Sequence, residues 1–178
     1  MKIRELQRRM AEELPQVYTL SSITTELDDL IHISGPSHDR LGAEAAECLH
    51  TALGGTPCLP PPPKLGEVHL YRHPLSGWAT VDVTFENLIG GLRAEGRASG
   101  FLVAPPNTEP STDTVYSVTL HGNTARLRLH YLPEEIVGQV LYYGYGLNPY
   151  ANLTDEGDRA IPCFGPLLLD AIEEDYII

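Results

Sequence analysis

The chain has 178 residues, a formal net charge of −12 and a sequence pI near 4.9. Hydrophobic residues make up 42% and charged residues 20%, which is typical of a globular rather than a disordered chain. The sequence contains no basic patch and no apolar run long enough to cross a bilayer, so we expect neither a nucleic-acid partner nor a membrane span.

Cysteine usage and the N-terminus bear on the cellular compartment. Cys48, Cys58 and Cys163 are too few and too widely spaced for a disulfide framework or a zinc site. The first residues are charged but lack the apolar region of a signal peptide, so the chain read literally is cytoplasmic. If Met1 is internal to a longer precursor, a secreted or periplasmic location is expected instead.

Residues 1–55 predict a helix, a strand and a second helix. Apolar residues spaced three and four apart predict the first helix, which Pro15 ends: Ile3, Leu6, Met10 and Leu14. A short strand is predicted at Val17–Leu20, and a second helix after Gly35 and Pro36. The predicted inner side of this helix comprises Leu41, Ala45, Cys48, Leu49 and Ala52. One strand cannot pair its own edges, so this α-β-α piece needs a neighbour.

The prolines at positions 60–63 divide the chain. Consecutive prolines lack amide donors and favour a stiff, extended backbone, so residues 56–66 are predicted to be a linker. The hydrophobic period then changes to two, as at Val81, Val83 and Phe85. Other predicted strands are Val68–Tyr71, Gly100–Ala104, Val115–Leu120, Ala125–Tyr131 and Gln139–Tyr143. Short strands separated by turn residues predict an antiparallel β-sandwich over residues 67–178, and an α+β fold class overall.

Asp29 and His32 are the candidate catalytic residues. A carboxylate three residues before a histidine, in a loop after a strand, can hold the imidazole Nδ1–H and leave Nε2 free as a general base. The pattern has only four residues, so a helix-capping Asp and a surface His remain the alternative.

The surrounding residues resemble the SGNH (GDSL-type) hydrolases, and in particular the sialate O-acetylesterase group. Residues 27–35 and the helix from Arg40 to Ala46 are similar to that family's closing Asp-x-x-His block. Three later segments are similar to its β-domain, namely residues 83–87, 90–94 with 100–101, and 142–153. The resemblance implies residues 1–55 to be the C-terminal part of a flavodoxin-like catalytic domain. It also implies that Asp29 orients His32 and that His32 activates a serine.

The family's nucleophile block and oxyanion donors have no counterpart in this sequence. No serine of the chain lies in such a block, and the serines are Ser21, Ser22, Ser34, Ser37, Ser76, Ser99, Ser111 and Ser117. Ser37 comes closest, but it lies beside the histidine block rather than in a strand-to-helix elbow. A base without a nucleophile gives little catalysis, so the chain alone is expected to be inactive.

The sequence therefore predicts the C-terminal part of a carbohydrate ester hydrolase that uses no cofactor and no metal. Its expected partners are an acetylated carbohydrate substrate and a missing N-terminal catalytic segment or companion chain. Two alternatives remain. The sandwich could be a non-catalytic module that binds a carbohydrate or a protein, with Trp78 and several tyrosines as a stacking platform. The chain could also be a truncated gene product without a function of its own.

Overall fold

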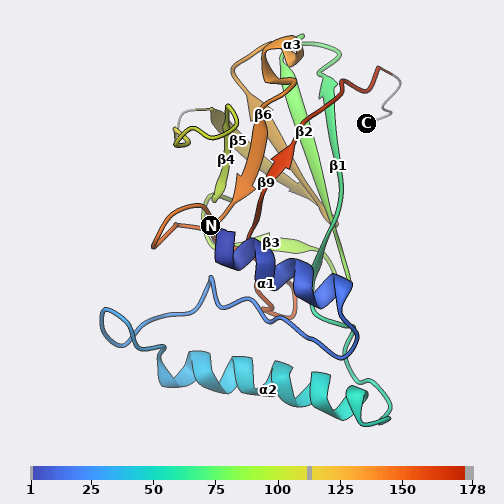
Figure 1. Cartoon of the computed structure of the whole chain (residues 1–178), viewed down its shortest axis with the longest axis vertical. Coiled ribbons are helices and arrows are strands. Elements are labelled where there is room, and N and C mark those ends of the chain that lie inside the picture. The colour runs from blue at the N-terminus through green and yellow to red at the C-terminus, as the bar shows by residue number, and fades with distance from the viewer. Residues whose placement is uncertain (1, 112–113, 175–178) are drawn as a thin grey trace.

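The computed structural model describes residues 2–111 and 114–174. Helices and antiparallel strands occur together, which confirms the α+β class (Figure 1). The helices are α1 (Lys2–Glu13), α2 (Gly35–Ala52) and α3 (Pro133–Ile136). The strands are β1 (Lys64–Arg72), β2 (Ala79–Glu86), β3 (Leu92–Ala94), β4 (Phe101–Ala104), β5 (Val115–His121), β6 (Thr124–Leu129), β7 (Val140–Tyr143), β8 (Leu153–Asp155) and β9 (Phe164–Leu168).

Two antiparallel sheets enclose the main core. One has the strand order β1-β2-β6-β5 and the other β4-β7-β9, while β3 and β8 form a separate pair. The inward residues of β2 are those that the alternation predicted, and Val81 lies opposite Leu127 of β6. Phe85 contacts Phe164 across the two sheets, with ring centroids 6.4 Å apart. The predicted strands of this region are present, and a turn at residues 122–123 joins β5 to β6.

The proline segment is fastened to the sandwich by a buried ion pair. Asp155 and Arg159 are almost fully buried, and the Arg159 guanidinium lies 2.7 Å from the Asp155 carboxylate. Arg159 also donates hydrogen bonds to the carbonyl oxygens of Pro60 and Pro61, at 2.8 and 2.9 Å. Strand β1 begins at Lys64, inside the range that the sequence assigned to the linker. The carbonyl groups of Pro60 and Pro61 therefore lie against the sandwich.

Two predictions about the N-terminal part are wrong. Val17–Leu20 is not a strand, because no other described strand lies beside it to form a ladder. The expected inner side of α2 is also wrong in part, since Ala45, Leu49 and Ala52 are exposed. Both errors have one physical cause: the described chain does not supply the surface that these residues would pack against. The predicted helices themselves are confirmed at α1 and α2.

Helix α1 packs against the sandwich through polar residues. The Arg4 guanidinium donates to the carbonyl oxygens of Gly144, Gly146 and Leu147 at 2.8–3.1 Å. The Glu5 carboxylate accepts a hydrogen bond from the backbone N–H of Gly165 in β9. Figure 1 shows α1 and α2 together below the strands, with the connecting segment running between them.

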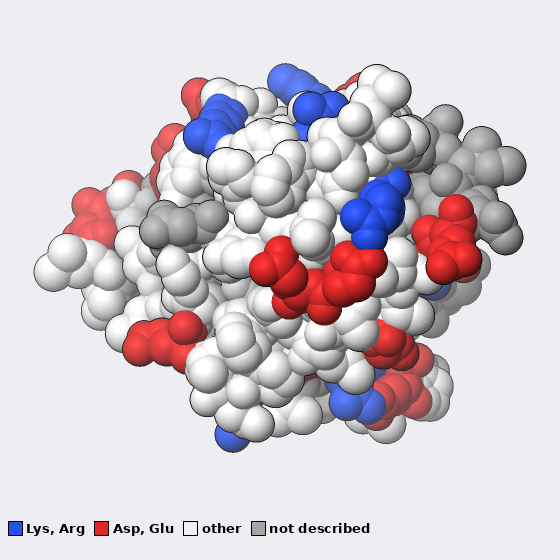
Figure 2. All heavy atoms as spheres, turned by 90° about the horizontal axis from the view of Figure 1, so that it is seen from above, with Lys and Arg blue, Asp and Glu red and all other residues white. Residues whose placement is uncertain are grey.

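The surface of the protein is acidic. Seen from the α3 end, Asp and Glu side chains gather in groups while Lys and Arg are scattered (Figure 2). None of the described helices is long and apolar enough to cross a membrane.

Candidate active site

Asp29 and His32 lie on a short hairpin that leads into α2. An isolated antiparallel bridge joins Leu27 to Ile33, and the Asp28 amide donates to the His32 carbonyl at 2.9 Å. The hairpin ends at Ser34, whose hydroxyl caps α2 by accepting from the Ser37 amide. Local turn and capping interactions therefore determine the shape of this loop.

The two candidate residues are hydrogen-bonded to each other. His32 Nδ1 lies 2.6 Å from Asp29 Oδ2, and Asp29 Oδ1 accepts from the amides of Ile31 and His32 at 2.8 Å each. The bond to the His32 ring, followed by the two amide bonds, lowers the pKa of Asp29 below its usual value. An ionised carboxylate that holds Nδ1–H leaves Nε2 of the neutral ring as the proton acceptor.

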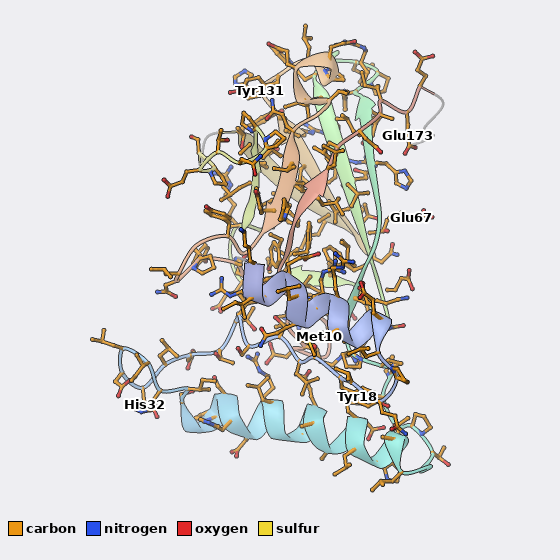
Figure 3. The ribbon with its side chains drawn as sticks, viewed as in Figure 1. Met10, Tyr18, His32, Glu67, Tyr131 and Glu173 are labelled. Carbon is orange, nitrogen blue, oxygen red and sulfur yellow. The ribbon has the colours of Figure 1, made fainter. Side chains whose placement is uncertain are left out.

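The pair is open to solvent. The His32 side chain is 71% exposed and the Asp29 side chain 54% exposed. His32 is labelled in Figure 3 at the edge of the molecule, in the hairpin next to the start of α2. Water therefore screens the interaction, and the described residues provide little of the desolvation that strengthens catalytic hydrogen bonds.

Ser37, the serine whose surroundings come closest to a nucleophile motif, has a structural role. Ser37 is buried, receives a hydrogen bond from the Ser34 hydroxyl at 3.0 Å, and accepts another from the Glu26 amide at 3.0 Å. Within residues 2–111 and 114–174, the only hydrogen-bond partner of the His32 ring is Asp29. The geometry thus joins the predicted acid and base and places no described serine hydroxyl on the base.

A cavity of about 330 Å³ lies beside the hairpin. It is lined by Leu27 and Ile33 from the base of the hairpin, by α1, and by segments that are distant in sequence. Its other lining residues are Arg4, Gln7, Arg8, Thr19, Leu20, Ser21, Ser22, Ile23, Thr25, Leu147, Asn148, Pro149, Pro162 and Cys163. Many of these carry hydroxyl, amide or guanidinium groups. Sequence reasoning missed this cavity, because no local pattern shows that α1 and residues 147–149 meet.

The aromatic residues divide between the core and the surface. Tyr143 is fully buried, and its hydroxyl accepts a hydrogen bond from the Leu153 amide, so it is a core residue. On the surface, the centroid of the His130 ring lies 5.2 Å from that of the Trp78 ring and 5.6 Å from that of the Tyr116 ring. In the part of the chain that the structure describes, no three His, Cys, Asp or Glu side chains are grouped to hold a metal ion.

Comparison with known proteins gives a likeness in structure. No protein-family model matches the sequence, and no curated protein matches it. The structure is similar to that of a carbohydrate acetylesterase from Xanthomonas citri, with a TM-score of 0.57, 19% identity and coverage of 79% of this chain. The match spans 30% of the length of that enzyme. The chain thus shares its fold with part of a carbohydrate acetylesterase.

Proposed function

We propose that this chain is the C-terminal part of a carbohydrate ester hydrolase of the sialate O-acetylesterase type, in which His32 is the general base and Asp29 orients it. The observation that carries the proposal is the 2.6 Å bond from His32 Nδ1 to a carboxylate that two backbone amides hold in place. A histidine that acts as the base in acyl transfer needs an acid that orients it, a proton on Nδ1 and a free Nε2.

The structural likeness supports the same assignment. The similar protein is a carbohydrate acetylesterase, and the region of likeness spans 30% of its chain. A nucleophile and oxyanion donors are therefore expected on polypeptide outside these 178 residues, as the absence of a nucleophile block in the sequence also indicates.

In the proposed reaction, His32 Nε2 takes the proton of an incoming serine hydroxyl while the serine oxygen attacks the ester carbonyl. The protonated ring then gives that proton to the departing sugar oxygen, which leaves an acetyl-serine. Water then attacks the acetyl-serine while His32 takes its proton, the bond to the serine oxygen breaks, and His32 returns the proton to that oxygen as acetate is released. Throughout the cycle, Asp29 stays ionised and stabilises the charged imidazole.

The test uses the chain alone and the chain joined to the polypeptide encoded directly upstream. Release of acetate from acetylated sugars is measured for the wild type, for His32→Ala and for His50→Ala as a matched exposed-histidine control on α2. Activity of the joined protein that is lost in His32→Ala and retained in His50→Ala supports the proposal. Equal activity of the two variants would contradict it.

A second candidate is a carbohydrate-binding module. The observation that favours it is the surface cluster around His130, in which Trp78 is 39% and Tyr116 44% exposed, since partly exposed aromatic rings stack on sugar faces. Sugar binding that is lost in Trp78→Ala, without hydrolysis in any form of the protein, would favour the module over the enzyme.

A further inference from the structure

The outer face of the four-stranded sheet carries positive charge beside the aromatic rings around His130. Leu129 at the end of β6 is fully buried in the core, so its neighbours Arg128 and His130 point to the opposite face of the sheet. These two residues share one face of the chain and lie roughly 7 Å apart along it. In the register of the sheet, Arg128 lies between Thr80 of β2 and Ser117 of β5.

The aromatic rings of this face are accessible to a ligand. The Trp78 and Tyr116 rings are inclined to the His130 ring by 78° and 49°, so the rings do not stack face to face. All three side chains are at least partly exposed. In the described part of the chain, no hydrogen bond engages the Trp78 indole N–H, the Tyr116 hydroxyl or the His130 ring nitrogens. The rings therefore offer both an apolar surface and polar groups to a ligand.

Two arginines beside these rings keep their positive charge uncompensated. Arg128 is exposed, and its guanidinium takes part in no ion pair or hydrogen bond with the residues that the structure describes. The Arg97 guanidinium donates a hydrogen bond to the Tyr116 carbonyl oxygen, a neutral group that does not offset its charge. Arg126 differs, because Asp82 binds its guanidinium through two hydrogen bonds of 2.8 Å. This local positive charge, in a chain with a net charge of −12, is suited to an anionic ligand.

We propose that Trp78, Tyr116, His130 and Arg128 form a binding site for a carbohydrate that carries carboxylate groups, that is, a hexuronate chain. A sugar ring has apolar C–H faces and hydroxyl groups, which match rings that expose a face and retain polar groups. The planar Arg128 guanidinium binds the sugar carboxylate through two parallel hydrogen bonds, and Arg97 adds positive charge beside it.

The proposed sugar site is remote from the candidate catalytic pair. Figure 3 labels Tyr131, the residue after His130, near α3, and labels His32 near the start of α2 at the other end of the molecule. The inference rests on the carbohydrate binding of the second candidate function and gives its ligand class. It does not depend on the proposed esterase reaction.

Trp78 provides a direct readout, because it is the only tryptophan of the chain. The whole chain is titrated with a tetramer of galacturonic acid while the fluorescence of Trp78 is recorded, and binding is measured in parallel by calorimetry. The matched probe is the same tetramer with its carboxyl groups reduced to alcohols. We expect the acidic tetramer to change the fluorescence, to bind about tenfold more tightly than the neutral one, and to bind more weakly as salt is added.

Two variants separate the charge from the aromatic surface. Arg128→Gln is expected to weaken binding of the acidic tetramer about tenfold and to leave binding of the neutral one unchanged, because only the carboxylate contact is lost. Trp78→Ala is expected to weaken binding of both tetramers in calorimetry. The matched control is Arg93→Gln, since Arg93 is an exposed arginine on β3, outside the four-stranded sheet. Circular dichroism establishes that each variant is folded.

The outcomes distinguish this proposal from the functions proposed above. Equal binding of the two tetramers, or equal effects of Arg128→Gln and Arg93→Gln, overturns the carboxylate site but leaves a general carbohydrate-binding module. Binding of neither tetramer overturns both. Tighter binding of a glutamate-rich peptide than of the acidic tetramer also overturns the proposal, because the occupant would then be a peptide. His32→Ala is expected to bind the acidic tetramer as the wild type does, and a loss of binding in this variant would contradict a separate site.

Discussion

Asp155→Ala is expected to destabilise the protein severely, because it removes one partner of a fully buried ion pair. The Asp155 carboxylate accepts hydrogen bonds from the amides of Ile89, Gly157 and Arg159 at 2.9–3.0 Å and from the Arg159 side chain at 2.7–2.9 Å. Alanine would leave the Arg159 guanidinium, which is 3% exposed, without its counter-ion. Three buried or partly buried amides would lose their acceptor at the same time.

The magnitude follows from these contacts. Removing one member of a buried, hydrogen-bonded pair costs about 3–5 kcal/mol of unfolding free energy. For a chain of this size, 1 kcal/mol corresponds to roughly 2–4 °C in the melting temperature. The expected fall is therefore on the order of 10 °C. The exposed pair Lys64–Glu86, with an N–O distance of 2.8 Å, provides the matched control, because such a pair contributes about 0–1 kcal/mol.

The assay is urea unfolding of the wild type, Asp155→Ala and Glu86→Ala, followed by near- and far-ultraviolet circular dichroism. Coincident transitions in the two signals establish that the free energies can be compared. A loss below about 1 kcal/mol for Asp155→Ala, or equal losses for the two variants, would refute the reasoning. Either result would mean that the pair does not hold the proline segment on the sandwich.

Three further predictions concern ionisable groups. In the completed enzyme, Asp29→Asn is expected to lower kcat about 10²–10⁴-fold, because the asparagine favours the wrong tautomer of His32; an unchanged kcat for acetate release would count against the orienting role. Burial raises the pKa of Glu44 above 4.5, although two nearby arginines lower it. Ionisation of Glu44 therefore reduces the free energy of unfolding as the pH rises above 4.5. Glu44→Gln should therefore unfold in urea at about pH 7 no more easily than the wild type, and a clear destabilisation would contradict this. Burial lowers the pKa of His69, but its hydrogen bonds, of which the bond to Glu173 has the largest effect, raise the pKa above 6.5 overall. Protonated His69 therefore stabilises the fold below pH 6.5, and this contribution is lost as the pH rises through the raised pKa. His69→Gln should melt at a lower temperature than the wild type at about pH 6 and converge with it at about pH 9, and parallel melting curves at both values would refute this.

The β-sandwich could be predicted from the sequence because its information is local. The alternation at Val81, Val83 and Phe85 determines which side of β2 faces the hydrophobic core, and the Gly122–Asn123 turn determines the register of β5 with β6. The same holds for the Asp29–His32 bond, which depends on a spacing of three residues within one hairpin.

Long-range polar contacts could not be predicted in this way. Nothing in the residues around Arg4 shows that its guanidinium meets carbonyls near residue 146, or that Arg159 reaches the carbonyls of Pro60 and Pro61. The strand at residues 17–20 was predicted from propensity, but a strand exists only when a neighbour accepts its hydrogen bonds. Among residues 2–111 and 114–174, no strand lies beside residues 17–20.

The local closure of the Asp29–His32 hairpin has a kinetic consequence. The Leu27–Ile33 bridge and the two amide bonds to Asp29 hold the carboxylate that binds the His32 ring, and no distant residue of the described ranges contributes a hydrogen bond to that ring. The loss of orientational freedom of the imidazole is therefore part of folding and not of complex formation. Under the proposed function, a segment that supplies the serine would have to position only that serine, so the high effective concentration that speeds an intramolecular proton transfer would be reached as soon as the serine arrives.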